Sequence, residues 1–263
     1  MCRIAGGIGK SAPDNLLLIS QLESLKHRGP DDKGTYINSG ISLGMCRLAI
    51  VEIDDGRQPG TDLTEKIHLV FNGEIYNYLE LKYELAQNGI NCRTSSESEI
   101  LANLYLAFGL GFVHKLNGMF AFAFWDCETE KLLLARDRMG KKPLYYHKSS
   151  DEFIFSSDIR VMLALAPSLS FTTLERISTW LFWQTIPGNH TLLTNVMALA
   201  PGSYMEIDQH RQITSSFCTL KAPGTIRIDE KDALVEIQQL MDVSIKKRLI
   251  SDVPLACFLS GGI

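Results

Sequence analysis

Hydrophobic residues along the chain recur with two different periods, and the period typical of strands dominates the first half. Residues 2–8 are apolar and glycine-rich, which predicts a buried strand that tolerates close approach of a neighbouring backbone. Residues 118–125 alternate Phe with Ala, so both faces are apolar. This pattern predicts a central strand covered on both sides, with large side chains facing one way and small ones the other. Further strands are predicted at 34–38, 41–51, 67–71, 132–136, 144–147, 153–156, 192–197, 203–207 and 213–217.

Apolar residues at helical spacing predict helices between these strands. Two of the helices are expected to open with a capping box, one formed by Asn77 with Glu80 and the other by Ser96 with Glu99. Asp14 is the expected cap of the first helix. The predicted helices are 14–25, 77–87, 96–108, 159–165, 174–182 and 229–250.

The last part of the chain has its own pattern. A linker with Pro223 and Gly224 is followed by the long amphipathic helix 229–250, and then by an apolar strand, 253–259, that runs into Ser260-Gly261-Gly262. A helix, a buried strand and a glycine-rich turn begin a nucleotide-binding α/β unit. The sequence stops before the helix that would receive the phosphates, so we expect a fragment or a truncated product.

Composition narrows the function classes. The 263 residues are 45% hydrophobic and 21% charged, with a net charge of −4, which is typical of a globular protein with a real core and does not favour a nucleic-acid surface. We find no signal peptide and no apolar run long enough to cross a membrane, so we expect a cytoplasmic protein without a membrane partner. Six scattered cysteines and six scattered histidines, without metal-ligand spacing, predict reduced thiols and no metal site.

Cys2 is the first candidate for chemistry. Removal of Met1 would leave a thiol and a free α-amine on one residue, and the amine has a reference pKa of about 7.7–8.0, so it is a usable base near neutral pH. This places nucleophile and base together, as in N-terminal nucleophile enzymes. Taken alone, a cysteine near a chain start is more often a buried small hydrophobe.

Three other positions each allow two interpretations. Asn72-Gly73 after a buried strand is typical of a turn, but an Asn amide and the following N–H can also bind one oxyanion. Arg47 either lies in solvent at the end of a strand, or its guanidinium binds a substrate carboxylate through paired hydrogen bonds. Glu97 either complements a helix dipole or is the counter-ion of a substrate ammonium group.

The order of the motifs decides between the two interpretations for Cys2, Asn72 and Arg47. The chain resembles the glutamine-hydrolysing asparagine synthetases over essentially its whole length. The motifs that carry the resemblance are Cys2, His27-Arg28-Gly29-Pro30-Asp31, Arg47-Leu48, Asn72-Gly73-Glu74-Ile75-Tyr76-Asn77, the segment from Ala135 to Tyr146, and Ser260-Gly261-Gly262.

The resemblance implies an α+β fold: a four-layer αββα sandwich of the class II, N-terminal nucleophile glutamine amidotransferases. This glutaminase domain is expected over residues 1–220, with its C-terminal strands and linker from about 187. Residues 221–263 are expected to begin a truncated ATP-binding domain of the synthetase type. The activity implied is glutamine hydrolysis to glutamate and ammonia, without a cofactor. ATP, Mg²⁺ and aspartate belong to the missing synthetase part, so this chain alone should not make asparagine. A homodimer is expected only from the family.

The resemblance also assigns roles to individual residues. Cys2 would be the nucleophile, with Asn72 and Gly73 as the oxyanion hole. The expected contacts to glutamine come from Arg47, Leu48, Ile50, Val51, Asn72, Gly73, Glu74 and Glu97. Part of the nucleotide loop would be Leu259, Ser260, Gly261 and Gly262. The segment Arg136–Tyr146 is expected to be scaffold, with Arg136, Asp137 and Arg138 forming a buried polar network behind the pocket.

Two departures from the family pattern keep alternatives open. The family usually has Asp where this chain has Glu97, which is one methylene longer, so we expect weaker glutamine binding than Asp would give. The Asp and Ser that continue the nucleotide loop are missing. The alternatives are an amidotransferase for a different acceptor, including a sugar-phosphate or phosphoribosyl type, and an inactive remnant that serves as an interaction module.

Overall fold

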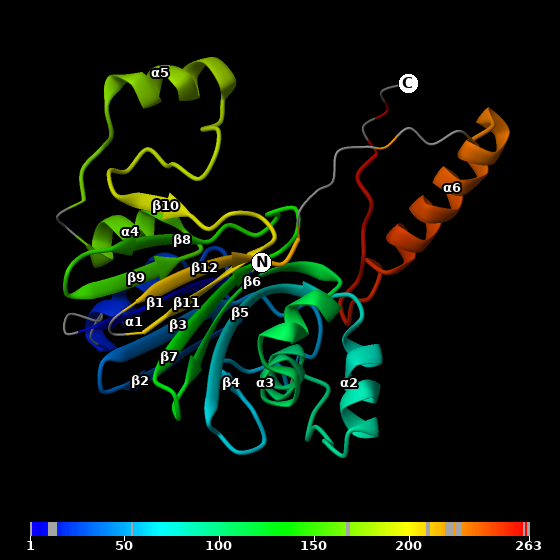
Figure 1. Ribbon diagram of the computed structural model, residues 1–263, viewed down its shortest axis with the longest axis horizontal. Coiled ribbons are helices and arrows are strands. Elements are labelled where there is room, and N and C mark those ends of the chain that lie inside the picture. The colour runs from blue at the N-terminus through cyan, green and yellow to red at the C-terminus, as the bar shows by residue number, and fades with distance from the viewer. Residues whose placement is uncertain are drawn as a thin grey trace.

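Two antiparallel sheets of six strands each form the body of the molecule, and helices cover their outer faces (Figure 1). The computed structural model describes residues 2–9, 15–53, 55–166, 169–208, 211–218, 224, 228–259 and 261. Met1, Asp14, Ser260 and Gly262, which carried sequence-based expectations, lie outside this described part.

The first sheet carries the N-terminal strand at its centre. Its outer face is covered by α1 (Asn15–Ser24) and α4 (Ile159–Leu165), whose apolar residues pack against the small side chain of Ala5 and its neighbours. The strands, in spatial order, are β10 (Val196–Ala198), β8 (Tyr145–Lys148), β9 (Glu152–Ser156), β1 (Arg3–Gly9), β3 (Ile41–Arg47) and β2 (Asp32–Asn38).

The second sheet lies under the other helical layer. Its outer face is covered by α2 (Tyr78–Gln87), α3 (Glu97–Phe108) and the 3₁₀ helix η1 (Gly109–Lys115). The strands, in spatial order, are β12 (Gln212–Ser216), β11 (Ser203–Ile207), β7 (Lys131–Arg136), β6 (Gly118–Asp126), β5 (Ile67–Ile75) and β4 (Gly60–Thr61).

Strand β6 shows why the layers stack in this way. Its Phe side chains at 120, 122 and 124 pack into the cluster under α3 and η1. Ala121 and Ala123 face the other sheet, in the core between the two sheets. The predicted division into a large-residue face and a small-residue face is confirmed, and with it the α+β four-layer αββα sandwich.

Two predicted strand ends were wrong. Strand β3 ends at Arg47, not at 51, because the Arg47 guanidinium binds backbone carbonyls of residues 51 to 53 and curls the chain into a loop. Strand β5 does not end at 71 but continues to Ile75, because Asn72 and Gly73 pair with β6. The Asn-Gly pair is therefore part of a strand, not of a loop.

Neither predicted capping box is present. The Asn77 side chain donates to the carbonyl of Lys115 and accepts from the N–H of Asn117, which ties α2 to the loop after η1. The Glu99 carboxylate accepts from the backbone N–H groups of Arg93 and Thr94. Tertiary partners thus compete successfully for side chains that could have capped their own helices.

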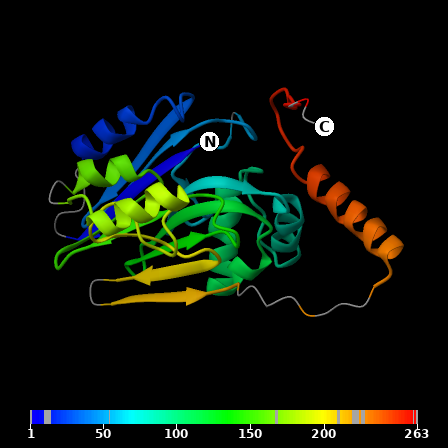
Figure 2. The same ribbon diagram turned by 90° about the horizontal axis from the view of Figure 1, so that it is seen from above.

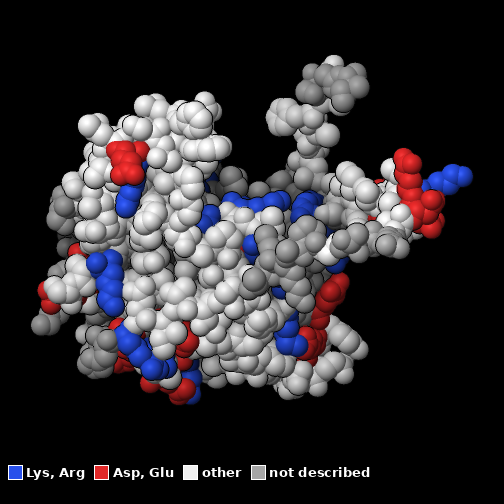
Figure 3. Space-filling model, turned by 45° about the horizontal axis from the view of Figure 1, so that its top comes forward, with Lys and Arg blue, Asp and Glu red and all other residues white. Residues whose placement is uncertain are grey.

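Two helices lie outside the four layers (Figures 1 and 2). Neither α5 (Leu174–Trp183) nor α6 (Glu230–Lys246) has a buried residue, and the predicted apolar stripe of α6 is exposed. In Figure 3, Lys and Arg side chains gather along a hollow of the surface between α5 and α6. Of the helices described, none combines the length and the apolar character needed to cross a bilayer.

The predicted strand 253–259 was wrong. The described residues of this segment form no strand, and Phe258 and Leu259 are exposed. An apolar sequence becomes a buried strand only when a neighbouring strand satisfies its backbone, and no such neighbour is present in the part of the chain described here.

Candidate active site

One pocket gathers every residue that sequence analysis assigned to catalysis or to glutamine binding. It lies between the N-terminus of β1, the loop after β3, the end of β5 and the start of α3. The pocket is lined by Cys2, Arg47, Leu48, Ile50, Val51, Glu52, Gly56, Gln58, Phe71, Asn72, Gly73, Glu74, Ser96, Glu97, Ser98 and Lys142.

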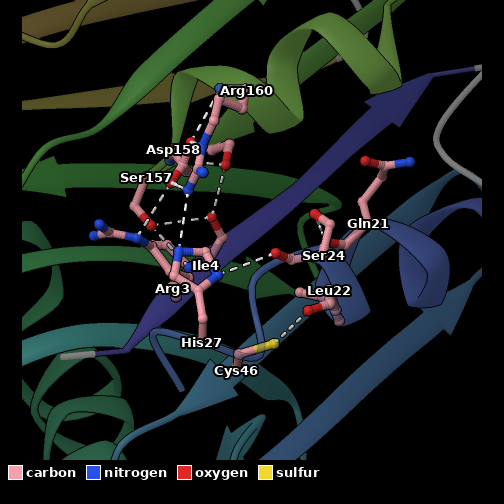
Figure 4. A network of polar contacts seen from close by, with 11 residues as sticks. Arg3, Ile4, Gln21, Leu22, Ser24, His27, Cys46, Ser157, Asp158 and Arg160 are labelled. Carbon is pink, nitrogen blue, oxygen red and sulfur yellow. Dashed lines mark hydrogen bonds and ion pairs between the residues drawn. The ribbon is translucent and has the colours of Figure 1, made fainter. Parts of the chain in front are cut away.

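A network behind the pocket fixes the start of β1 and so positions Cys2 (Figure 4). The Arg3 guanidinium lies 3.5 Å from the Asp158 carboxylate, and both side chains are about nine-tenths buried. Arg160 donates to the same carboxylate at 2.8 Å. The N–H of Ile4 donates to the Ser157 hydroxyl at 2.9 Å. These contacts hold the backbone immediately after Cys2 on the rim of the pocket.

The Cys2 thiol is largely withdrawn from solvent. Burial raises its pKa, while its contact with the Leu48 carbonyl and the charges of Arg47 and Lys142 act in the opposite direction. The Sγ lies 3.8 Å from the Leu48 carbonyl oxygen. Because the thiol is mostly protonated at neutral pH, attack requires a base that removes its proton.

Strand β5 presents backbone donors to the pocket along its open edge. The N–H of Phe71 donates to the Gln58 side chain at 2.7 Å, and the N–H of Ile75 donates to the Glu97 carboxylate. These two N–H groups point away from β6. Gly73 lies midway between them and therefore has the same orientation.

The pairing with β6 gives the same result for Gly73. Its partner in the ladder is Phe120, and both backbone groups of Phe120 bond to Asp137 on the far side. Gly73 and Phe120 thus form a non-hydrogen-bonded pair, and the Gly73 N–H is directed toward the pocket. Only glycine fits here, because a Cβ atom would lie 2.2 Å from the Met119 carbonyl oxygen.

The Asn72 side chain provides a second donor beside that N–H. Asn72 is 1% exposed, and neither atom of its amide has a hydrogen-bond partner among the described residues. Leaving a buried polar group unpaired costs about 1–3 kcal/mol. The Asn72 amide is therefore available to donate a hydrogen bond to a ligand oxygen in the pocket.

Arg47 shapes the loop that closes the pocket. Its guanidinium donates to the carbonyls of Ile53 and Val51, both at 3.1 Å, and to that of Glu52 at 2.6 Å. These bonds use three of its five N–H groups. The Nε–H and one Nη1–H have no partner within the described ranges.

Three acidic side chains, Glu52, Glu74 and Glu97, line the pocket. Burial raises the pKa of Glu97 to about 8 and that of Glu52 to about 7, and it also raises the pKa of Glu74. Glu52 accepts from the backbone N–H of Glu97 at 3.1 Å, and its second oxygen is buried without a partner among the described residues. Crowded, poorly solvated carboxylates of this kind favour binding of a cation.

Seven lining residues were missed by sequence analysis, and two of them, Glu52 and Lys142, carry ionisable side chains. Glu52 lies in the same loop as Ile50 and Val51, so its position after Arg47 was a usable signal. Lys142 belongs to the segment interpreted as scaffold, yet it is 3% exposed and lines the pocket. Burial lowers its pKa, and the neighbouring Glu74 and Cys2 act in the opposite direction. Arg136, Asp137 and Arg138 bond mainly to backbone groups and do not form hydrogen bonds with one another among those described.

The raised pKa of Glu97 predicts that stability depends on pH. Between the unperturbed value of 4.5 and about 8, the folded chain holds a proton that the unfolded chain releases, so rising pH favours unfolding. We expect the free energy of unfolding to fall from about pH 5 to 8, and Glu97→Gln to make this fall smaller. Chemical denaturation across this range measures the effect. Glu236→Gln, on the exposed surface of α6, is the control, and an equal change in both variants would contradict the assignment.

Of the residues predicted to bind nucleotide, the two that the structure describes, Leu259 and Gly261, do not line this pocket. Leu259 is 92% exposed, and Gly261 has a φ of +66°. Ser260 and Gly262 lie outside the described residues. Their assignment stays a prediction.

Comparison with known proteins agrees with this geometry. A family model described as glutamine amidotransferase domain matches residues 1–218, and one described as asparagine synthase matches residues 236–263. Asparagine synthetase [glutamine-hydrolyzing] 1 of Bacillus subtilis is 32% identical over 268 residues, which cover 100% of this chain and 42% of that protein. A putative asparagine synthetase 2 of Methanocaldococcus jannaschii is 33% identical, over 92% of this chain and 50% of that protein.

These curated relatives are much longer than this chain, which spans half of their length or less. Among solved structures, a glutamine phosphoribosylpyrophosphate amidotransferase from Bacillus subtilis has a TM-score of 0.61 at 19% identity and covers 83% of this chain and 50% of its own, which supports the fold. The family model covers most of the residues, including every side chain that lines the pocket. The chain belongs to the glutamine amidotransferase domain family.

Proposed function

We propose that this chain hydrolyses L-glutamine to glutamate and ammonia with Cys2 as the nucleophile. The observation that carries the proposal is the Asn72 amide, buried without a partner among the described residues beside the inward-facing N–H of Gly73. Two donors fixed next to a thiol fit an oxyanion better than any ground-state group. The rest of the pocket fits an amino acid.

The reaction would proceed in two balanced steps. The Cys2 sulfur bonds to the side-chain carbonyl carbon of glutamine while the thiol proton passes to the α-amine of Cys2. The amide C–N bond then breaks, the leaving nitrogen takes that proton, and ammonia departs. Water attacks the resulting thioester, and the C–S bond breaks to give glutamate and the free thiol. Proton transfer from the thiol requires the free α-amine of Cys2, and therefore the removal of Met1.

The charged walls would orient the substrate. The positive charge of Arg47 suits the α-carboxylate, and the carboxylates of Glu97 and Glu52 suit the α-ammonium. Lys142 adds a positive charge near the thiol, which favours the thiolate. The weaker binding expected from Glu97 in place of Asp stays a prediction.

The ammonia would serve an amidation reaction in a longer protein. We infer ATP-dependent conversion of aspartate to asparagine from the names of the relatives, with another acceptor as the alternative. The described part of residues 248–261 forms no loop with a helix behind it that would hold phosphates.

The proposal is tested with the purified chain, after intact mass has shown that Cys2 is the first residue. We expect equal amounts of glutamate and ammonia from L-glutamine and none from L-asparagine, which is one methylene shorter. A glutamine analogue with a diazoketone in place of the amide should label Cys2, as peptide mass mapping would show. A folded chain with a free Cys2 amine that releases no glutamate would contradict the proposal.

A further inference from the structure

A residue far along the chain contacts the loop that closes the pocket. The carboxylate of Asp252 accepts from the backbone N–H of Glu52 at 2.6 Å. In return, the N–H of Asp252 donates to the carbonyl of Ile50 at 2.9 Å. The first of these bonds joins positions 200 residues apart, and together the two bonds tie Asp252 to the loop.

Asp252 contacts the loop at a residue with an unfavourable backbone conformation. Glu52 has a φ of +56°, in the left-handed region that a residue other than glycine adopts only when its surroundings hold it there. Its carbonyl is held by Arg47 at 2.6 Å and by the N–H of Gly56 at 2.9 Å. The bond from Asp252 fixes the other backbone group of the same residue.

The position of Glu52 matters for the pocket wall. With its backbone fixed, its carboxylate reaches the N–H of Glu97 and stands beside the Glu97 side chain. A change of the Glu52 backbone would move this carboxylate and would also move Ile50 and Val51, which line the same pocket.

The same C-terminal segment also contacts the residue that follows β5. The Arg248 guanidinium lies 4.7 Å from the centre of the Tyr76 ring, a cation–π contact just after the end of β5. Figures 1 and 2 show α6 running from its far end toward the sandwich, so the segment that follows it begins close to the sandwich. It belongs to the part matched by the asparagine synthase model, whereas the loop belongs to the amidotransferase part.

We propose that Asp252 is a positioning residue for glutamine binding, which holds the loop at Ile50–Glu52 in the shape that the ligand requires. This inference rests on the proposed glutaminase function. It adds that the segment after α6 supplies part of the binding geometry. Because coupling between two sites is reciprocal, ligand in the pocket also holds Asp252.

The test compares Asp252→Ala with Asp252→Asn in the full chain. Asp252→Ala removes the acceptor, and we expect the KM for L-glutamine to rise about 3- to 10-fold with kcat changed by less than about 2-fold, the size expected for one exposed charge-assisted hydrogen bond. Asp252→Asn keeps an oxygen that can accept the Glu52 N–H and should restore most of the KM. Asp242→Ala, on the exposed surface of α6, is the control.

Hydrogen exchange supplies a readout that does not need activity. Amides of residues 50–53 should exchange faster in Asp252→Ala than in the parent chain, and not in Asp242→Ala. Unchanged KM and unchanged exchange in Asp252→Ala would overturn the inference. If the parent chain releases no glutamate, the proposed function fails, and the exchange comparison still decides whether Asp252 holds the loop.

Discussion

Replacing Cys2 by alanine is expected to lower glutamate release from glutamine to the uncatalysed level, a loss on the order of 10⁴-fold or more. Cys2 carries the only thiol among the described residues that line the pocket. The variant should still bind glutamine, because the charged walls remain. Initial rates of glutamate release, together with glutamine binding measured by calorimetry, separate these two effects.

A matched control is available for this substitution. Cys127 is also a partly buried free thiol, but it lies at the end of β6 and not in the pocket. Cys127→Ala should keep the activity of the parent chain. Residual glutaminase activity in Cys2→Ala, or an equal loss in Cys127→Ala, would show that Cys2 is not the nucleophile.

Replacing Asn72 by leucine, which has a similar shape, is expected to change activity and stability in opposite directions. Loss of one oxyanion donor lowers kcat by about 10²- to 10³-fold in well-studied cases, with little change in KM. The free energy of unfolding should rise by about 1–3 kcal/mol, because an unpaired buried amide is removed. Steady-state kinetics and chemical denaturation measure the two effects.

Asn103 provides the comparison for stability. It is also buried, at 2% exposed, but its amide donates to the Glu99 carbonyl at 2.9 Å and accepts from the N–H of Leu63 at 3.3 Å. Asn103→Leu should therefore destabilise the chain, since it leaves the N–H of Leu63 without its acceptor. If Asn72→Leu were destabilising to the same degree, its amide would have partners and the oxyanion assignment would lose its basis.

Much of the fold could be predicted because local patterns and tertiary packing agree. The Phe and Ala alternation in β6 identified a central strand with two different neighbours, and the core clusters confirm it. The capping boxes could not be judged in the same way. Asn77 and Glu99 found partners in other segments, and a pattern four residues long contains no information about such partners.

The site shows the same limit at the level of single residues. Motif order brought Cys2, Arg47 and Asn72 together before their geometry was known. Glu52 and Lys142 were missed, because their role depends on which way a loop turns after β3 and after β7. The strand predicted at 253–259 failed for a related reason, since an apolar run defines a strand only together with the strand beside it.

Gly73 has a consequence for any attempt to map this site by mutagenesis. The group that it contributes is a backbone N–H, which every amino acid except proline would retain. Any side chain at this position would meet the Met119 carbonyl oxygen first, so a loss of activity would report a shift between β5 and β6. Substitution of Gly73 by another amino acid can therefore shift this N–H donor but cannot remove it alone. An amide-to-ester replacement made by semisynthesis would remove the hydrogen while keeping the strand in place.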